Sequence, residues 1–186
     1  MIFPAVAAAH IAARLSLPFH PPQAVEAAGN KYLAREHFAA AGLPVPVFYR
    51  VPLTADPADA CLRAPWPCVL KPLGLSGSRG VIRADNPAEF AAAFERIRTL
   101  LNAPELLRHR HPALSFLQVE EYIPGREFAL EGLMTRGELR TLAIFDKPDP
   151  LEGPFFEETI YVTPSPASRP RCRPLCGRRS KAPPPP

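Results

Sequence analysis

The segment that most constrains this chain is PCVLKPLGLSGSRGVIRA, residues 67–84, in which a buried-strand pattern delivers Lys71 to a glycine-rich loop. The loop, residues 73–80, leads into a second strand pattern and not into a helix. Walker-type and Rossmann-type phosphate loops both open a helix, so neither fits. A loop between two strands favours a flexible flap, whose backbone N–H groups approach phosphate oxygens while a lysine ammonium neutralises their charge.

The loop alone leaves two interpretations open, because ordinary turns also contain glycine and a lysine beside one is often solvated. A second motif, FLQVEEYIPGREFALEGL, covers residues 116–133. Its strand pattern ends in two carboxylates, and the short connection at Tyr122 and Ile123 can offer backbone groups to an adenine edge. Glu127 can accept hydrogen bonds from ribose hydroxyls. Each glutamate alone also fits a solvent-facing strand, but the two motifs in this order favour a nucleotide site.

Hydrophobic periodicity predicts an α+β fold and not a regularly alternating, doubly wound parallel sheet. The clearest helix begins at Asn86, with Pro87 in its first turn and Glu89 as a capping-box partner. Other helices are predicted at residues 5–15, 31–41 and 56–63, and strands at 45–51, 67–70, 81–84, 116–122, 127–134 and 138–146. The last two strands read as a hairpin that turns at residues 135–137.

These motifs together resemble the ATP-grasp superfamily of ligases. The resemblance is carried by Asn30 and Lys31 at a helix start, by AGLPVP, by Lys71 with its glycine loop, and by VEEYIPGREF. Within the superfamily the chain is similar to L-amino acid ligases, carnosine synthases and biotin-carboxylase-like proteins, over residues 5–166. The resemblance implies an ATP-dependent carboxylate–amine ligase that works through an acyl phosphate, with small-molecule carboxylate and amine substrates.

The resemblance also implies roles for individual residues. Lys31 and Lys71 correspond to lysines on the nucleotide phosphates, the loop serines and glycines to the flap, residues 120–123 to an adenine hinge, and Glu127 to a ribose ligand. The implied ATP-binding residues are Lys31, Lys71, Ser76, Gly77, Ser78, Gly80, Glu120, Glu121, Tyr122, Ile123 and Glu127. Glu157, Glu158 and Thr159 correspond to a segment that borders the γ-phosphate and the acceptor substrate.

The resemblance implies an incomplete ATP-grasp fold. Residues 1–20 read as a remnant of a preceding α/β domain, 21–166 as a partial ATP-grasp domain with its central lobe at 44–122, and 167–186 as a disordered basic tail. Relatives hold Mg²⁺ through a glutamate and an E-x-N pair, but residues 167–186 contain no Asp, Glu or Asn. We therefore assign no metal ligand, expect ATP binding with ligation lost or severely impaired, and interpret the chain as a fragment or as a frame change near residue 166.

Charge is concentrated in the last twenty residues. They hold six of the basic residues and no acid, so the net charge of +4 becomes about −2 for the rest of the chain. Nucleic-acid binding is therefore not expected of the folded part, although binding through the tail stays an alternative, as does a non-catalytic ATP-binding regulatory module. No secretory signal or long apolar run is apparent, so we expect a cytoplasmic protein without membrane contact; the oligomeric state stays open.

Overall fold

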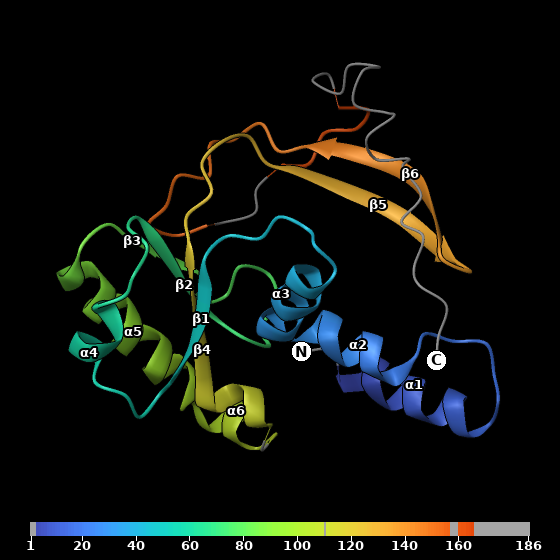
Figure 1. Cartoon of the computed structure of the whole chain (residues 1–186), viewed down its shortest axis with the longest axis horizontal. Helices are drawn as coiled ribbons and strands as arrows, with labels where there is room; N and C mark the ends of the chain where they lie inside the picture. The colour runs from blue at the N-terminus through green and yellow to red at the C-terminus, as the bar shows by residue number, and fades with distance from the viewer. Residues whose placement is uncertain (1–2, 110, 157–159, 166–186) are drawn as a thin grey trace. The chain divides into compact units, whose positions relative to one another are not determined.

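The computed structural model describes residues 3–109, 111–156 and 160–165, which form two compact units (Figure 1). The first unit comprises residues 3–123 and 153–156, and the second comprises residues 124–152 and 160–165. The candidates Glu157, Glu158 and Thr159 and the tail at 167–186 lie outside the described residues.

The first unit is built on a four-stranded sheet in the order β1-β4-β2-β3. Every neighbouring pair is antiparallel, which confirms the prediction against a doubly wound parallel sheet. The strands are β1 (Phe48–Pro52), β2 (Cys68–Pro72), β3 (Ile82–Ala84) and β4 (Phe116–Glu121). The chain thus passes from β2 to β3 through the glycine loop, as the sequence predicted.

The two faces of this sheet differ in chemistry because side chains alternate along each strand. Leu70 pairs with Val119 on the face that carries the hydrophobic core, whereas Lys71 pairs with Gln118 on the opposite face. Helix α5 (Pro87–Leu101) covers the core face, and α3 (Lys31–Ala40) lies on the other side of the sheet (Figure 1). The core-facing residues of α5 are Phe90, Ala93, Phe94, Ile97 and Leu101.

Helix α5 begins with the predicted capping box. The Asn86 side chain accepts a hydrogen bond from the Glu89 N–H at 3.0 Å, and the Glu89 carboxylate accepts one from the Asp85 N–H at 2.9 Å. Two backbone donors that lack an intrahelical partner are thereby satisfied. The cap fixes where the helix starts, and the apolar spacing along the helix determines which face meets the sheet.

The N-terminal region contains one helix more than the sequence predicted. Helix α1 (Phe3–Arg14) is followed by α2 (Pro22–Gly29) and then by α3, which Asn30 caps by accepting from the Tyr32 and Leu33 N–H groups at 3.1 and 3.3 Å. Pro22 lies in the first turn of α2, where proline is well suited because the first N–H groups of a helix have no intrahelical partner. The remaining helices are α4 (Pro57–Cys61), α6 (Pro104–Leu107) and the 3₁₀ helix η1 (Pro112–Ser115).

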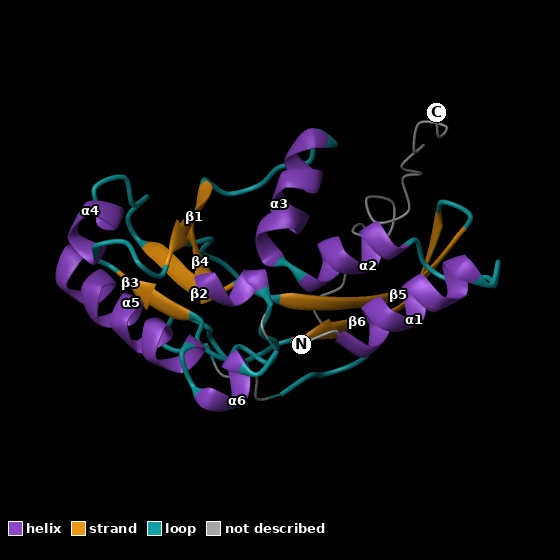
Figure 2. Cartoon of the chain, turned by 90° about the horizontal axis from the view of Figure 1, so that it is seen from below, coloured by secondary structure: helices purple, strands orange, loops and turns teal. Residues whose placement is uncertain are grey.

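The second unit is built on the predicted hairpin, β5 (Phe128–Thr135) and β6 (Glu138–Asp146) (Figure 2). Arg136 and Gly137 form the turn with φ values of 51° and 79°. The buried residues of the second unit include two charged ones, Asp146 and Lys147, which are 3% and 7% exposed. Arg126 donates to both oxygens of Asp146 at 2.9 and 2.8 Å, and Lys147 pairs with Glu127.

Across the described residues, no helix has the length and apolar character that a membrane crossing requires.

Candidate functional site

The polar face of the four-stranded sheet carries a buried ion pair between Lys71 and Glu120. Lys71 lies on β2 and Glu120 on the adjacent β4, where the register places Lys71 opposite Gln118. The side chains of Lys71 and Glu120 are 12% and 8% exposed. The strand pairing therefore brings together two residues that the sequence analysis assigned to different motifs.

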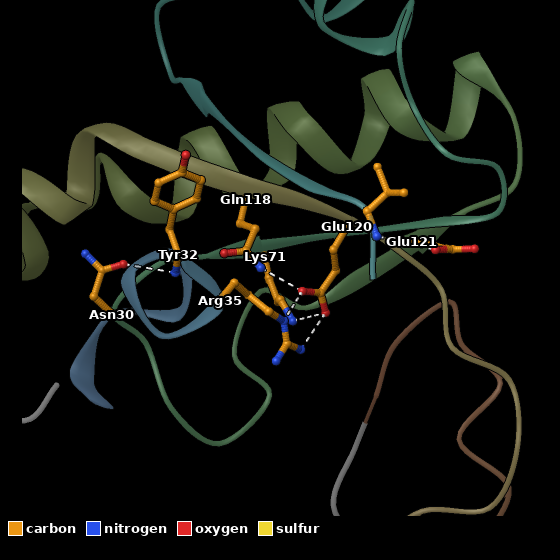
Figure 3. Close-up of polar contacts among 8 residues, drawn as sticks. Asn30, Tyr32, Arg35, Lys71, Gln118, Glu120 and Glu121 are labelled. Atoms are coloured by element: carbon orange, nitrogen blue, oxygen red, sulfur yellow. Dashed lines mark hydrogen bonds and ion pairs between the residues drawn. The ribbon is translucent and has the colours of Figure 1, made fainter. Parts of the chain in front are cut away.

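Arg35 and Gln118 complete the surroundings of the Glu120 carboxylate (Figure 3). Arg35 reaches it from α3, with Nε 3.2 Å from Oε2 and Nη2 3.5 Å from Oε1. The Gln118 side-chain amide donates to Oε2 at 2.6 Å. Gln118 Oε1 is buried and has no hydrogen-bond partner among the described residues. Sequence analysis missed both residues, since an arginine on a helix and a glutamine in a strand carry no signal of their own.

Lys31 joins the same group of charges from the start of α3. Its ammonium donates to the Leu75 carbonyl, and its backbone N–H donates to the Leu73 carbonyl at 3.0 Å, so α3 holds the first residues of the flap. Lys31, Arg35 and Lys71 thus supply three cations around the single carboxylate of Glu120. We call these four residues the charge cluster; its surplus of positive charge suits an anionic ligand.

Burial changes the proton affinities within the charge cluster. Burial foremost, with the nearby Lys71 charge, lowers the pKa of Lys31 to about 8, although Glu120 opposes the shift. Burial also lowers the pKa of Lys71, against the attraction of Glu120. For Glu120, burial by itself raises the pKa, but Lys71 and Arg35 outweigh it and the net shift is downward. The carboxylate therefore stays ionised at neutral pH.

The flap loop is anchored at both ends, by Lys31 at its start and by packing around Gly80 at its end, and is open in its middle. Gly80 has a φ of +77°, and a Cβ there would lie 2.9 Å from both Leu100 Cδ2 and Pro72 Cγ. Gly77 also has a positive φ, +62°, but its Cβ would meet nothing within 4 Å. Ser76 and Gly77 are exposed, whereas Ser78 is partly buried, with a φ of 51°. The predicted flap residues thus occupy a loop whose far end is packed against β2 and α5.

The predicted hinge begins at the end of β4. The Glu121 N–H donates to the Val47 carbonyl at 2.9 Å and the Tyr122 N–H to the Pro67 carbonyl at 3.0 Å, so both amides are engaged within the chain. Ile123 follows with an exposed side chain, and its N–H has no assigned bond among the described residues. The amide that best suits a ligand in this segment is therefore that of Ile123.

Glu127 belongs to the second unit, where its half-exposed carboxylate pairs with the buried ammonium of Lys147. Lys147 also lies over the Tyr161 ring, with Nζ 5.2 Å from the centroid. The structure thus gives Glu127 a partner that the sequence analysis missed. The ribose role stays a prediction.

The described residues do not fit a metal site, because no three His, Cys, Asp or Glu side chains come together in a group that could hold an ion. Glu120, the carboxylate of the charge cluster, is already shared between Lys71, Arg35 and Gln118. The chemistry of the site is that of cations and backbone amides. A cavity of about 370 Å³ in the first unit is lined by residues such as Val6, Leu33 and Leu114; it borders the flap at Gly74, but no residue of the charge cluster lines it.

Comparison with known proteins identifies the family. The ATP-grasp domain family matches residues 64–175, which contain the flap, Lys71, the hinge and Glu127. The chain belongs to the ATP-grasp family. The match covers β2, β3 and β4 of the four-stranded sheet and both strands of the hairpin, whereas β1 and α3 precede it.

Solved structures agree with this assignment. The L-amino acid ligase from Bacillus licheniformis matches 90% of this chain with 31% identity and a TM-score of 0.74. The biotin carboxylase domain of 2-oxoglutarate carboxylase from Hydrogenobacter thermophilus, solved with MgADP, ADP and bicarbonate, matches 92% with 19% identity and a TM-score of 0.66. At that identity the second match shows the ATP-grasp fold alone.

The chain spans only part of its relatives. It covers 38% of the Bacillus ligase. It also aligns over 121 residues with the uncharacterized protein y4rH of Sinorhizobium fredii, at 31% identity, which is 65% of this chain and 24% of that protein.

Proposed function

We propose that this ATP-grasp chain binds ATP, with the phosphates at the charge cluster and the flap, the adenine at the hinge and the ribose at Glu127. The parent activity that we propose is ligation of a carboxylate to an amine, such as an amino acid, through an acyl phosphate. The Bacillus L-amino acid ligase, at 31% identity over 90% of the chain, supports this substrate class.

The charge cluster is the observation that carries the proposal. Two cations, Lys71 and Arg35, contact the one carboxylate on the face of the sheet that is not packed against α5, and a third, Lys31, bonds to the flap itself. Such an excess of buried positive charge is costly unless an anion offsets it. A nucleotide triphosphate supplies that anion, and flap glycines with φ above zero allow backbone amides to approach it closely.

The direction of β2 supports one orientation for the nucleotide. Pro67, just before β2, bonds to Tyr122 of the hinge, whereas the flap follows Pro72 at the other end of the strand. Lys71 lies between these ends. A nucleotide with its adenine at Ile123 therefore extends its phosphates along β2, past Lys71 and under the flap.

Magnesium accompanies the nucleotide in the family, but the described residues do not fit a magnesium site. Our proposal for these 186 residues therefore includes no ligation step. The proposal for them is nucleotide binding.

Lys71→Met tests the proposal. We expect ATP affinity to fall roughly 10- to 100-fold, because a charge-assisted contact contributes about 1.5–3 kcal/mol. The melting temperature should change little, since Arg35 and Gln118 still neutralise and bond Glu120. Isothermal titration calorimetry and thermal unfolding measure the two quantities.

Arg50→Gln is the matched control, because Arg50 lies opposite Gln118 on β1 and rests over the Tyr32 and Phe116 rings. It removes one positive charge from the same sheet face without touching Glu120, and should leave ATP affinity within about threefold, as expected for a partly screened charge. Equal affinities of the Lys71→Met variant and the unsubstituted protein for ATP would contradict the proposal.

A further inference from the structure

We propose that Arg35 is a positioning residue of the nucleotide site, which retains the Glu120 carboxylate when Lys71 turns from it to the phosphates. This inference rests on the proposed ATP binding. It assigns a function to a residue of α3 that belongs to neither sequence motif.

The geometry around Glu120 allows an exchange of partners. Lys71 approaches Oε1, whereas Arg35 Nε and the Gln118 amide both approach Oε2. Arg35 also has a second nitrogen, Nη2, which lies 3.5 Å from Oε1, the same oxygen that Lys71 approaches. The guanidinium can therefore take over Oε1 by shortening this contact when Lys71 leaves.

The exchange is needed because Glu120 is buried, at 6% exposure. A buried carboxylate that loses its only cation is strongly unfavourable, so Lys71 on its own could not serve both Glu120 and a phosphate. Arg35 removes this conflict, because a planar guanidinium can bond both oxygens of one carboxylate. Without it, Glu120 competes with the ligand for the Lys71 ammonium.

If Glu120 and the ligand compete for Lys71, then Arg35 should affect ligand binding only when Glu120 is present. The test measures binding of inorganic tripolyphosphate and of ATP by calorimetry to four proteins: the unsubstituted chain, Arg35→Gln, Glu120→Gln and the double variant. Tripolyphosphate isolates the phosphate contacts, because it has no adenine or ribose. Thermal unfolding of each protein is followed in parallel.

We expect Arg35→Gln to weaken tripolyphosphate binding roughly tenfold or more, as the loss of a contact between charged groups does. In the Glu120→Gln background Lys71 has no competing carboxylate. There Arg35→Gln should weaken tripolyphosphate binding by no more than about threefold, through long-range charge alone. Arg50→Gln, which removes an equal charge on the same sheet face, should have the same small effect in both backgrounds.

Equal fold-changes for Arg35→Gln with and without Glu120 would overturn the inference, because Arg35 would then act only as one more charge. If Arg35→Gln unfolds, Arg35→Lys in the same two backgrounds provides the test, because lysine keeps the charge but cannot bond both oxygens of the carboxylate. Weaker tripolyphosphate binding that is seen only with Glu120 present supports the positioning role. Equally weakened binding in the Glu120→Gln background contradicts it. If the unsubstituted chain bound neither ligand, the proposed function itself would fail. If it bound both without this coupling, only the role of Arg35 would fail.

Discussion

The four-stranded sheet of the first unit and the hairpin of the second are both antiparallel, but they bury different kinds of side chain. The first sheet packs apolar residues of β2 and β4 against α5, with Leu70, Phe94 and Leu117 fully buried. The hairpin leaves Leu130 and Leu133 exposed, at 43% and 57%, together with four other large apolar side chains, those of Phe128, Met134, Leu139 and Leu142. Its buried positions include charged ones.

The difference teaches that alternation of side chains along a strand gives a hydrophobic core only where another element covers one face. Asp146 and Lys147 are buried in the second unit because each has an ionic partner, Arg126 and Glu127. The first unit should therefore respond most to lost volume, and the second to lost charge.

Removal of core volume should produce the largest effect. Phe94→Ala is expected to reduce the free energy of unfolding by about 3–5 kcal/mol, because it leaves a cavity between α5 and the sheet. Leu133→Ala, in the exposed hairpin, should change it by less than about 0.5 kcal/mol. Urea unfolding of the two variants makes the comparison, and similar losses would show that the hairpin is covered as well as the sheet.

Loss of a charge partner should affect the second unit next most strongly. Arg126→Gln is expected to destabilise the hairpin by about 1–3 kcal/mol, since it leaves the carboxylate of Asp146 buried without its cation. Hydrogen exchange of the β5 and β6 amides should accelerate, while that of β2 and β4 stays unchanged. Arg140→Gln, on an exposed hairpin position, is the control, and equal acceleration in both variants would refute the prediction.

The pH dependence of ATP binding should locate the phosphates in the first unit. In the free protein the pKa of Lys31 is about 8, mainly through burial, so the residue is charged below that pH and neutral above it. Bound phosphate favours the charged form, so affinity should fall about tenfold between pH 7 and pH 9 and binding should take up protons. Calorimetry in buffers of different ionisation enthalpy measures that uptake. Lys31→Gln should remove it, and unchanged uptake in the variant would assign it to another group.

The smallest effect should test whether the second unit contributes to the site at all. Glu127→Gln is expected to weaken ATP binding about two- to fivefold, because an amide oxygen accepts a ribose hydroxyl less strongly than a carboxylate does. Binding of inorganic pyrophosphate, which has no ribose, should not change. If both ligands weakened equally, the Glu127 effect would arise from its pairing with Lys147 and not from a ribose contact.

Local signals in the sequence predicted much of this structure. Glycine and lysine spacing predicted the strand, loop and strand around Lys71, and apolar spacing with an Asn86 cap predicted α5. The missed helix α2 shows where local signals fail, since prolines that end one helix also begin the next.

The charge cluster could not be read from the sequence in the same way. Contact between Lys71 and Glu120 depends on the register of β2 against β4, and Arg35 joins them only because α3 lies over that face. Residues separated by 85 positions gave no pattern that links them. The sequence could not show which hinge amides are free to bind a ligand, for the same reason. The Glu121 and Tyr122 N–H groups donate to Val47 and Pro67, partners that lie far away along the chain.

The unequal packing of the two flap glycines has a consequence for engineering the domain. Since Gly80 is held by Leu100 and Pro72 while the Gly77 position is open, residues can be inserted at 76 and 77 without displacing the core. A set of chains with lengthened loops would then vary how readily the site closes over a ligand while global stability stays nearly constant, because each doubling of loop length costs only about 0.6 kcal/mol. Ligand residence time would become adjustable through loop length alone.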